Sequence, residues 1–286
     1  MSGHVSILLH IQSAMRQFLR RHFLRIAIAT TVVIAIVCFL CVWIPYQHDQ
    51  RVFQQISDVN GVVEFERYDP DWLLTSFHVH LMVFDRIRRV NLRGKQVTDE
   101  LLRAVGTLQN LEVLDLQNTA TTDAGMKHLA DLNRLHVLRL ELTQVTDEGL
   151  KSLQRLTNLQ VLHLDKTPIT DTGLKNLRGL INLRVLHLNA TKIGDRGLTH
   201  LEGLHHLKWL SLDNTLVGNG GLPVLKSMPN LNELDLECTR ITPAGLDDLK
   251  AMRGLESLSL FGTRIHGRER EELRSALPNC RVSPTH

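Results

Sequence analysis

Two histidines in matching sequence contexts are the side chains of this chain best suited to chemistry. His163 and His187 each end a Val-Leu-His stretch, stand 24 residues apart (187 minus 163), and have Asp165 close by. Imidazole and carboxylate groups bind transition metals, and imidazole also transfers protons near neutral pH. Two histidines without a fixed third ligand form a weak metal signal. A metal-dependent enzyme at His163 and His187 is therefore kept only as a hypothesis to test.

No other catalytic motif accompanies these histidines. The sequence contains no G-x-S-x-G, H-E-x-x-H, P-loop or dinucleotide-binding fingerprint. Carboxylates such as Asp171 and Asp195 recur with the same 24-residue spacing, which a catalytic pair would not be expected to do. The sequence therefore predicts no enzyme activity and no cofactor.

The sequence repeats every 24 residues through the C-terminal two thirds of the chain, and this repeat determines where the two histidines lie. Each unit reads L-x-x-L-x-L-x-x-T-x-I-T-D-x-G-L-x-x-L-x-x-L, and a degenerate first copy starts at Ile87, so that about eight units precede a partial one. The L-x-L segment alternates as a short strand, whereas the later leucines, three apart, line a helical turn. Neither apolar face can be buried within one unit, so neighbouring units must stack. One leucine recurs as Leu114, Leu138, Leu162, Leu186, Leu210, Leu234 and Leu258.

These units resemble leucine-rich repeats, particularly the ribonuclease-inhibitor-like and cysteine-containing subclasses. The resemblance implies an α/β solenoid, a curved horseshoe with parallel strands on its concave face and helices on its convex face. An anchor, a short cap and T-D-x-G-L repeats together resemble membrane-anchored leucine-rich-repeat proteins of environmental bacteria. The motifs behind this resemblance specify a fold and leave the ligand open.

The polar residues that recur in the repeat are interpreted as structural. The threonine that follows each strand can bond backbone groups of the bend. Thr146 or Asp147 can cap the incoming helix, and Asn219 in place of an aspartate predicts weaker capping. Cys280 occupies a leucine position and is expected to be buried. Cys238 would lie about 10 Å away, beyond disulfide reach, so both are expected to stay thiols.

The N-terminal region differs from the repeats in its composition. The chain has 33 Lys and Arg against 30 Asp and Glu, but residues 1–44 contain four arginines and no acidic residue, which leaves 29 against 30 (33 minus 4) for the rest. Residues 26–44 carry no charge and would span about 28 Å as a helix. A buried core helix and a cleaved signal peptide are the alternatives for this span, and the sequence favours a retained signal anchor over both. Arginines before the span predict a cytoplasmic N-terminus.

The sequence therefore predicts four segments. Residues 1–25 form a basic cytoplasmic N-terminus, 26–44 a transmembrane signal anchor, 45–86 a juxtamembrane segment and N-terminal cap, and 87–286 the leucine-rich-repeat domain. Within the cap, residues 52–59 suggest a short amphipathic helix, VVEFERY a strand, and the stretch from Asp71 a further apolar helix. A solenoid needs such a cap to cover its first apolar face.

The residues between the strand leucines form three columns on the expected concave face. A valine column ends in a tryptophan, beside a mixed polar column and an acidic one, which is typical of a protein-binding patch. The alternative for the valines is that β-branched residues simply suit strands. The candidate binding residues are Val113, Val137, Arg139, Glu141, Val161, His163, Asp165, Val185, His187, Trp209, Asp213 and Glu237.

These observations predict a membrane-anchored, non-enzymatic protein whose repeat domain lies outside the cytoplasm, in the periplasm or at the cell surface. Its concave face would bind another protein or a cell-envelope ligand. The small net charge argues against a nucleic-acid partner. The alternative is a cytoplasmic substrate adaptor of the ubiquitin-ligase type, although the sequence lacks an F-box-like module and the arginine flank argues for export.

Overall fold

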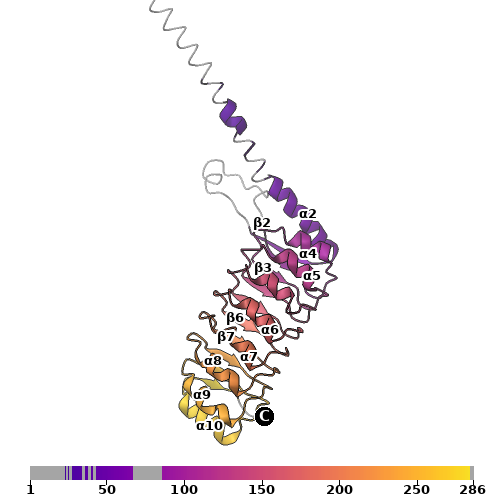
Figure 1. Cartoon of the computed structure of the whole chain (residues 1–286). Helices are drawn as coiled ribbons and strands as arrows, with labels where there is room; N and C mark the ends of the chain where they lie inside the picture. The colour runs from indigo at the N-terminus through magenta and orange to yellow at the C-terminus, as the bar shows by residue number, and fades with distance from the viewer. Residues whose placement is uncertain are drawn as a thin grey trace, which may run out of the picture. The chain divides into compact units, whose positions relative to one another are not determined.

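The computed structural model describes residues 43–66 and 86–283, together with a few positions between 23 and 40 (Figure 1). It divides into two compact units, of which the second comprises Arg51–Glu66 and Arg86–His286 and contains all the repeats. The helix expected from Asp71 onward lies outside the described residues.

Within the described residues, the second unit contains one sheet whose strands follow each other in chain order from β1 to β10. β1 pairs with β2 antiparallel, and every later pair is parallel and in register, one repeat to the next. The strands are β1 Val62–Glu66, β2 Arg86–Asn91, β3 Val113–Asp115, β4 Val137–Arg139, β5 Val161–His163, β6 Val185–His187, β7 Trp209–Ser211, β8 Glu233–Asp235, β9 Ser257–Ser259 and β10 Arg281–Val282.

Short helical segments return the chain from one strand to the next along the other side of this unit (Figure 1). Those of the repeats are α4 Asp99–Val105, α5 Asp123–Met126, η3 Lys127–Leu129, η4 Gly149–Leu153, α6 Asp171–Leu174, η5 Lys175–Leu177, α7 Asp195–Leu198, η6 Asn219–Gly221, α8 Leu222–Lys226, η7 Pro243–Gly245, α9 Leu246–Ala251 and α10 Gly267–Ala276. Many are a single turn, so tertiary packing rather than helix propensity holds them.

The core lies between the sheet and these helical segments. The central strand leucines and the leucines of the helical turns are buried, and each stacks on its equivalents in neighbouring units. Val52 and Ile56, from the part of α2 (Ile44–Asp58) that belongs to the second unit, join this core. Phe53 of the same helix packs against Phe65 of β1, with ring centroids 5.5 Å apart. The helix and strand expected near the start of the repeats are therefore present.

The threonine after each strand is structural, as predicted. Thr167 Oγ1 donates to the carbonyl of Leu164 at 2.5 Å, and Thr191 Oγ1 donates to Leu188 at 2.6 Å. The equivalent threonines from Thr119 to Thr263 make the same bond. These hydroxyls are buried, so each bond satisfies a carbonyl that has turned away from the strand ladder.

The aspartate of the Thr-Asp pair has a different role from the expected helix cap. Asp147 accepts hydrogen bonds from Thr170 of the next repeat, through the backbone N–H at 2.8 Å and the hydroxyl at 2.5 Å. Capping falls to the threonine instead, since Thr170 Oγ1 accepts from the N–H of Thr172. Capping is weaker at Asn219, as expected, because η6 has no side-chain cap. Asn219 nevertheless makes the bridge to the next repeat, since it accepts from the Thr242 N–H and donates to the Thr242 hydroxyl.

The recurring glycine follows from this bridge between repeats. A Cβ atom built on Gly173 would overlap Asp147 Oδ1, and one on Gly149 would overlap Asp123 Oδ1. The residues of the T-D-x-G motif therefore act together across two neighbouring repeats. The aspartate of one repeat fits against the threonine and the glycine of the next.

In the part of the chain that the structure describes, no helix has both the length and the apolar character needed to cross a bilayer. Several residues of the predicted anchor, 26–44, lie outside that part, as does nearly all of 1–25.

Candidate functional site

The candidate binding residues share one side of the sheet, which we call the strand face. It comprises the side chains at the first and third positions of β3 to β9 and at the second residue after each strand. The central leucine of each strand points the other way into the core, because successive side chains of a strand alternate. Of the candidates, Glu141 is buried, Trp209 is exposed, and those of intermediate burial are Val113, Val137, Arg139, Val161, His163, Asp165, Val185, His187, Asp213 and Glu237.

The valine column is a continuous row along the strand face. Val113, Val137, Val161 and Val185 pair directly across successive strands, and Val185 pairs with Trp209. The valines are half-buried, whereas the Trp209 side chain keeps 39% of its surface exposed. The exposed apolar surface of the row is therefore concentrated at the tryptophan.

Each histidine of the polar column faces a carboxylate from the repeat before it. His163 Nδ1 lies 2.9 Å from Glu141 Oε1, and His187 Nδ1 lies 3.7 Å from Asp165 Oδ2. These side chains keep between 11% and 17% of their surface exposed. Glu141 is thus a buried partner of His163 and does not belong to the solvent-facing acidic rim that the sequence suggested.

The two histidines and the tryptophan form an aromatic ladder across three strands. The rings of His163 and His187 stack with centroids 4.1 Å apart and an angle of 13° between their planes. His187 then meets Trp209 edge to face at 4.7 Å. Because aromatic pairs of this kind hold their rings in place, the ladder presents Trp209 on a supported surface.

The sequence places Asp165 near the histidines, as expected, but the contact of Glu141 with His163 was not expected. Glu141 and His163 are 22 residues apart, which is one repeat less two positions, and so are Asp165 and His187. Neighbours at that spacing lie diagonally across adjacent strands, within reach of long side chains. Comparing columns along the diagonal places both pairs on adjacent strands, and the rotamers then decide whether they touch.

Carboxylates gather at the C-terminal end of the strand face. Burial raises the pKa of Asp213, and the charge of Asp235 raises it further. Burial also raises the pKa of Glu237, followed by the charges of Asp235 and Asp213, while Arg270 lowers it. This end of the face is therefore acidic and incompletely neutralised, which favours a cationic group on a binding partner.

Replacing Asp213 by Asn should stabilise the chain at neutral pH and have little effect in acid. Because the pKa of Asp213 in the folded chain is above the ordinary 3.8, the folded chain binds the proton of this carboxyl more tightly than the unfolded chain does. The resulting stabilisation is complete below the ordinary pKa and is lost as pH rises through the folded-state value. We expect Asp213→Asn to raise the melting temperature by about 1–3 °C at pH 7.

Thermal unfolding followed by circular dichroism at pH 7 and in acid measures this difference. The matched control is Asp131→Asn, whose exposed carboxylate lies 3.8 Å from Arg155. A melting temperature that falls at pH 7, or a gain that is equal at both pH values, would contradict the proposed cause.

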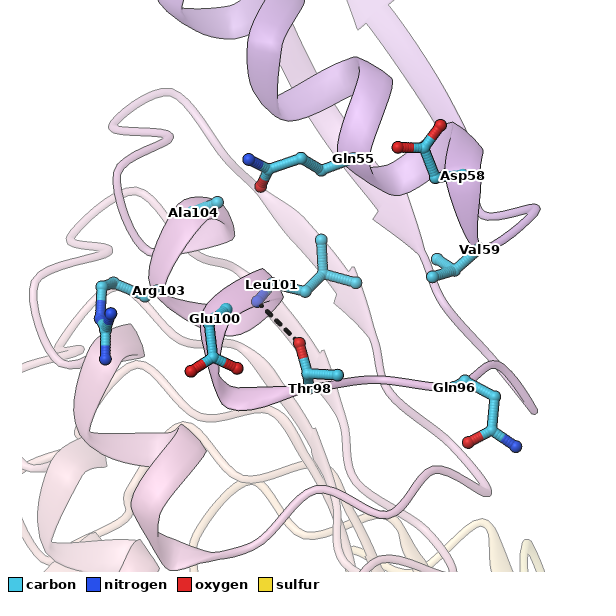
Figure 2. Close-up of a pocket in the computed structure, with 9 residues that line it drawn as sticks. All are labelled: Gln55, Asp58, Val59, Gln96, Thr98, Glu100, Leu101, Arg103 and Ala104. Atoms are coloured by element: carbon cyan, nitrogen blue, oxygen red, sulfur yellow. Dashed lines mark hydrogen bonds between the residues drawn. The ribbon is translucent and has the colours of Figure 1, made fainter.

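A separate cavity of about 460 Å³ lies beside α4, between the end of α2 and the first repeat (Figure 2). Its polar side chains, among them Gln55, Gln96 and Glu100, are exposed. The hydrogen bond drawn there, from the Leu101 N–H to Thr98 Oγ1 at 3.2 Å, is the N-terminal cap of α4. We therefore place the candidate site on the strand face rather than in this cavity.

The repeats match a known sequence family. A family model described as "Leucine Rich repeat" matches residues 133–153, 155–177, 179–201 and 227–250. A search of curated proteins gives no significant match. With the stacked parallel strands, these matches show that the chain contains leucine-rich repeats.

Solved structures with a similar fold include proteins of two bacteria. A leucine-rich-repeat protein of Leptospira interrogans is 24% identical, with a TM-score of 0.51 over 63% of this chain and 45% of that chain. Internalin C2 of Listeria monocytogenes is 22% identical, with a TM-score of 0.56 over 76% of this chain and 91% of that chain. The chain thus spans less than half of the Leptospira protein. At these identities the similarity concerns the fold alone.

Proposed function

We propose that this chain is a membrane-anchored, non-enzymatic interaction protein that binds another protein or a cell-envelope ligand through its strand face. The observation that carries the proposal is the exposure of Trp209 at the end of an aligned row of valines. Large aromatic side chains with apolar neighbours and a charged rim dominate the binding energy of protein interfaces.

The anchor is part of the same proposal. Residues 26–44 are uncharged and the four arginines precede them, which supports a cytoplasmic N-terminus and a repeat domain in the periplasm or at the cell surface. We further propose that the repeats are of the ribonuclease-inhibitor-like or cysteine-containing subclass, because a short helical segment of α or 3-10 type follows each strand from β2 to β9.

Site-specific crosslinking in intact cells tests this function. A photoreactive phenylalanine analogue in place of Arg139, whose side chain is 38% exposed on the strand face, should capture a defined partner. The same analogue in place of Lys175, at the start of η5 on the helical side, should not capture that partner. Adding Trp209→Ala should weaken capture by about 10-fold or more, because a hot-spot truncation costs about 2 kcal/mol.

The outcome separates the proposal from its alternative. A partner from the periplasm or the cell surface supports the proposed topology, whereas a cytoplasmic partner supports the substrate adaptor. Equal capture at both positions, or capture that survives Trp209→Ala, would remove the strand face as the binding surface.

A further inference from the structure

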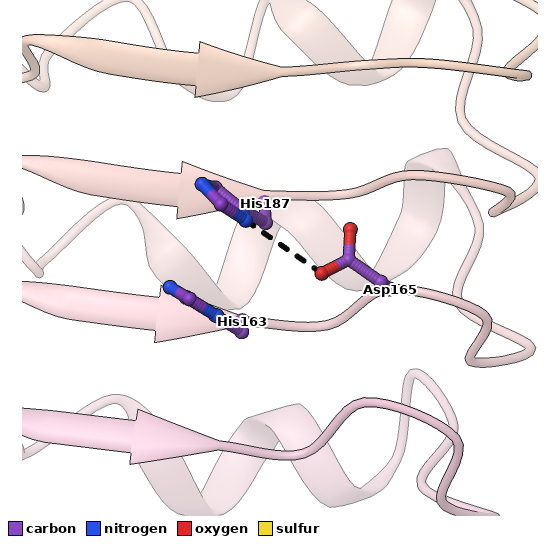
Figure 3. Close-up of side chains that lie close together, drawn as sticks. All are labelled: His163, Asp165 and His187. Atoms are coloured by element: carbon purple, nitrogen blue, oxygen red, sulfur yellow. Dashed lines mark ion pairs between the residues drawn. The ribbon is translucent and has the colours of Figure 1, made fainter. Parts of the chain in front are cut away.

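Three potential metal ligands converge on the strand face at the aromatic ladder. His163 ends β5, His187 ends β6, and Asp165 follows β5 by two residues, so the backbone brings all three side chains to one place (Figure 3). One ligand atom from each lies within 4.8 Å of the other two. The fixed third ligand, which the two histidines alone do not provide, is Asp165.

Neighbouring groups hold these ligands in position. Asp165 Oδ1 accepts a hydrogen bond from the Asn189 N–H at 2.8 Å, while Oδ2 lies 3.7 Å from His187 Nδ1, too far for a hydrogen bond. Glu141 Oε1 lies 2.9 Å from His163 Nδ1. A carboxylate bonded to a ligating imidazole is the usual outer contact of a metal site, where it fixes the ring and raises its basicity.

Two polar atoms at this place are buried without a partner. They are Glu141 Oε2 and His187 Nε2. An unpaired buried polar atom costs about 1–3 kcal/mol and calls for an explanation such as a bound ion or water. Glu141, Asp165 and the nearby Asp213 are acidic, and Arg139, which pairs with His163 across the strands, lies 3.8 Å from a further carboxylate, Asp115. The local charge therefore favours a cation.

We propose that His163, Asp165 and His187 bind a zinc ion, with a fourth position open to water or to a partner's side chain. Two imidazoles and a carboxylate are a ligand set that zinc accepts. Tetrahedral zinc places its ligand atoms about 3.4 Å apart, so ligand atoms that lie within 4.8 Å of one another must approach by about 1.4 Å at most. Rotation about the Cβ–Cγ bond of each imidazole provides this movement, because that torsion is broad.

Binding must also break the ring stack. An imidazole binds a metal in the plane of its ring, and two nearly parallel rings cannot both direct their planes at one ion. The rings therefore tilt apart when zinc enters, and the contact between His187 and Trp209 changes with them. The proposal is independent of the identity of any protein partner, since the metal alone probes it.

Calorimetric titration of zinc chloride into the full chain, purified in detergent and stripped with a chelator, tests the site. We expect one ion per chain in the tightest event, and His187→Ala or Asp165→Asn should weaken it by about 10-fold or more. Asp165→Asn keeps the acceptor for the Asn189 N–H and so guards against a folding defect. The matched control, His205→Ala, removes an exposed histidine and should leave the event unchanged.

Tryptophan fluorescence gives a second readout. Zinc should change the emission of the wild-type chain, and Trp209→Phe should remove that change because the other tryptophans lie far away in the sequence, before the repeats. The proposal is overturned if the wild-type chain binds no zinc, or if its tightest event is as strong in His187→Ala and Asp165→Asn as in His205→Ala.

Discussion

Replacing Arg270 by Met is expected to destabilise the last repeats by about 3 kcal/mol. Arg270 lies in α10 within a run of charged residues, yet only 3% of its surface is exposed. Its guanidinium donates to the carbonyls of Ile265 at 2.9 Å, Ser283 at 2.7 Å and Leu260 at 2.9 Å. Methionine fills most of the same volume but removes all three bonds. The Leu260 carbonyl keeps its bond from the Thr263 hydroxyl, whereas the Ile265 and Ser283 carbonyls lose the Arg270 donor, and unpaired buried acceptors are costly.

Hydrogen exchange of the β9 and β10 amides measures this effect most directly, because a repeat protein can open at one end while its centre stays folded. These amides should exchange about 100-fold faster in Arg270→Met, since 3 kcal/mol is about two factors of ten. The matched control is Arg268→Met, whose side chain is 89% exposed and pairs only with the Glu272 carboxylate among the described residues. Equal exchange in both variants would show that Arg270 does not stabilise the last repeats.

Replacing Asp147 by Ala is expected to lower the free energy of unfolding by about 2–3 kcal/mol. The change removes both bonds to Thr170 and leaves the Thr170 N–H without its acceptor at the junction of two repeats. Stacked repeats depend on each interface for their stability, so one weakened junction affects the units on either side. Urea unfolding followed by far-ultraviolet circular dichroism measures the loss.

A double-mutant cycle isolates the bridge. Thr170→Val removes the hydroxyl bond to Asp147 together with the cap of α6, but keeps the N–H bond to Asp147. Combining it with Asp147→Ala should cost less than the sum of the two single changes, because both remove the hydroxyl bond. Glu148→Ala is the control, since its exposed carboxylate pairs only locally with Lys151 among the described residues. Additive losses would mean that Asp147 stabilises the chain by another route.

Much of the fold could be predicted because a repeat encodes its own register. Leucines 24 residues apart must lie in equivalent places, so the sequence predicts parallel strands, a stacked core and the buried threonines without knowledge of any distant contact. The same reasoning predicted the columns of the strand face. The structure pairs Val161 with Val185 and His163 with His187, as this reasoning requires.

The candidate site was only partly predictable, because its interactions run between columns. The repeat pattern aligns equivalent positions of successive units. The contacts of Glu141 with His163 and of His187 with Trp209 join positions that are not equivalent. Whether such side chains meet depends on their rotamers and on the twist of the sheet, which a single sequence does not specify. The aspartate bridge escaped sequence reasoning for the same reason, since Asp147 fits the pattern of a helix cap.

The repeat, the stacking direction and the row that ends at Trp209 follow from the sequence alone, because periodic apolar residues can be buried in one way only. Tertiary structure alone decided the environment of the polar groups. Arg270 follows two charged neighbours and looks solvent-exposed in the sequence, but it is buried where the last repeat ends and the carbonyls of its strand and bend lack a following unit. Glu141 is likewise buried, because the neighbouring strand places His163 over it. Burial of a charge depends on what lies across the interface, and that information is absent from the local pattern.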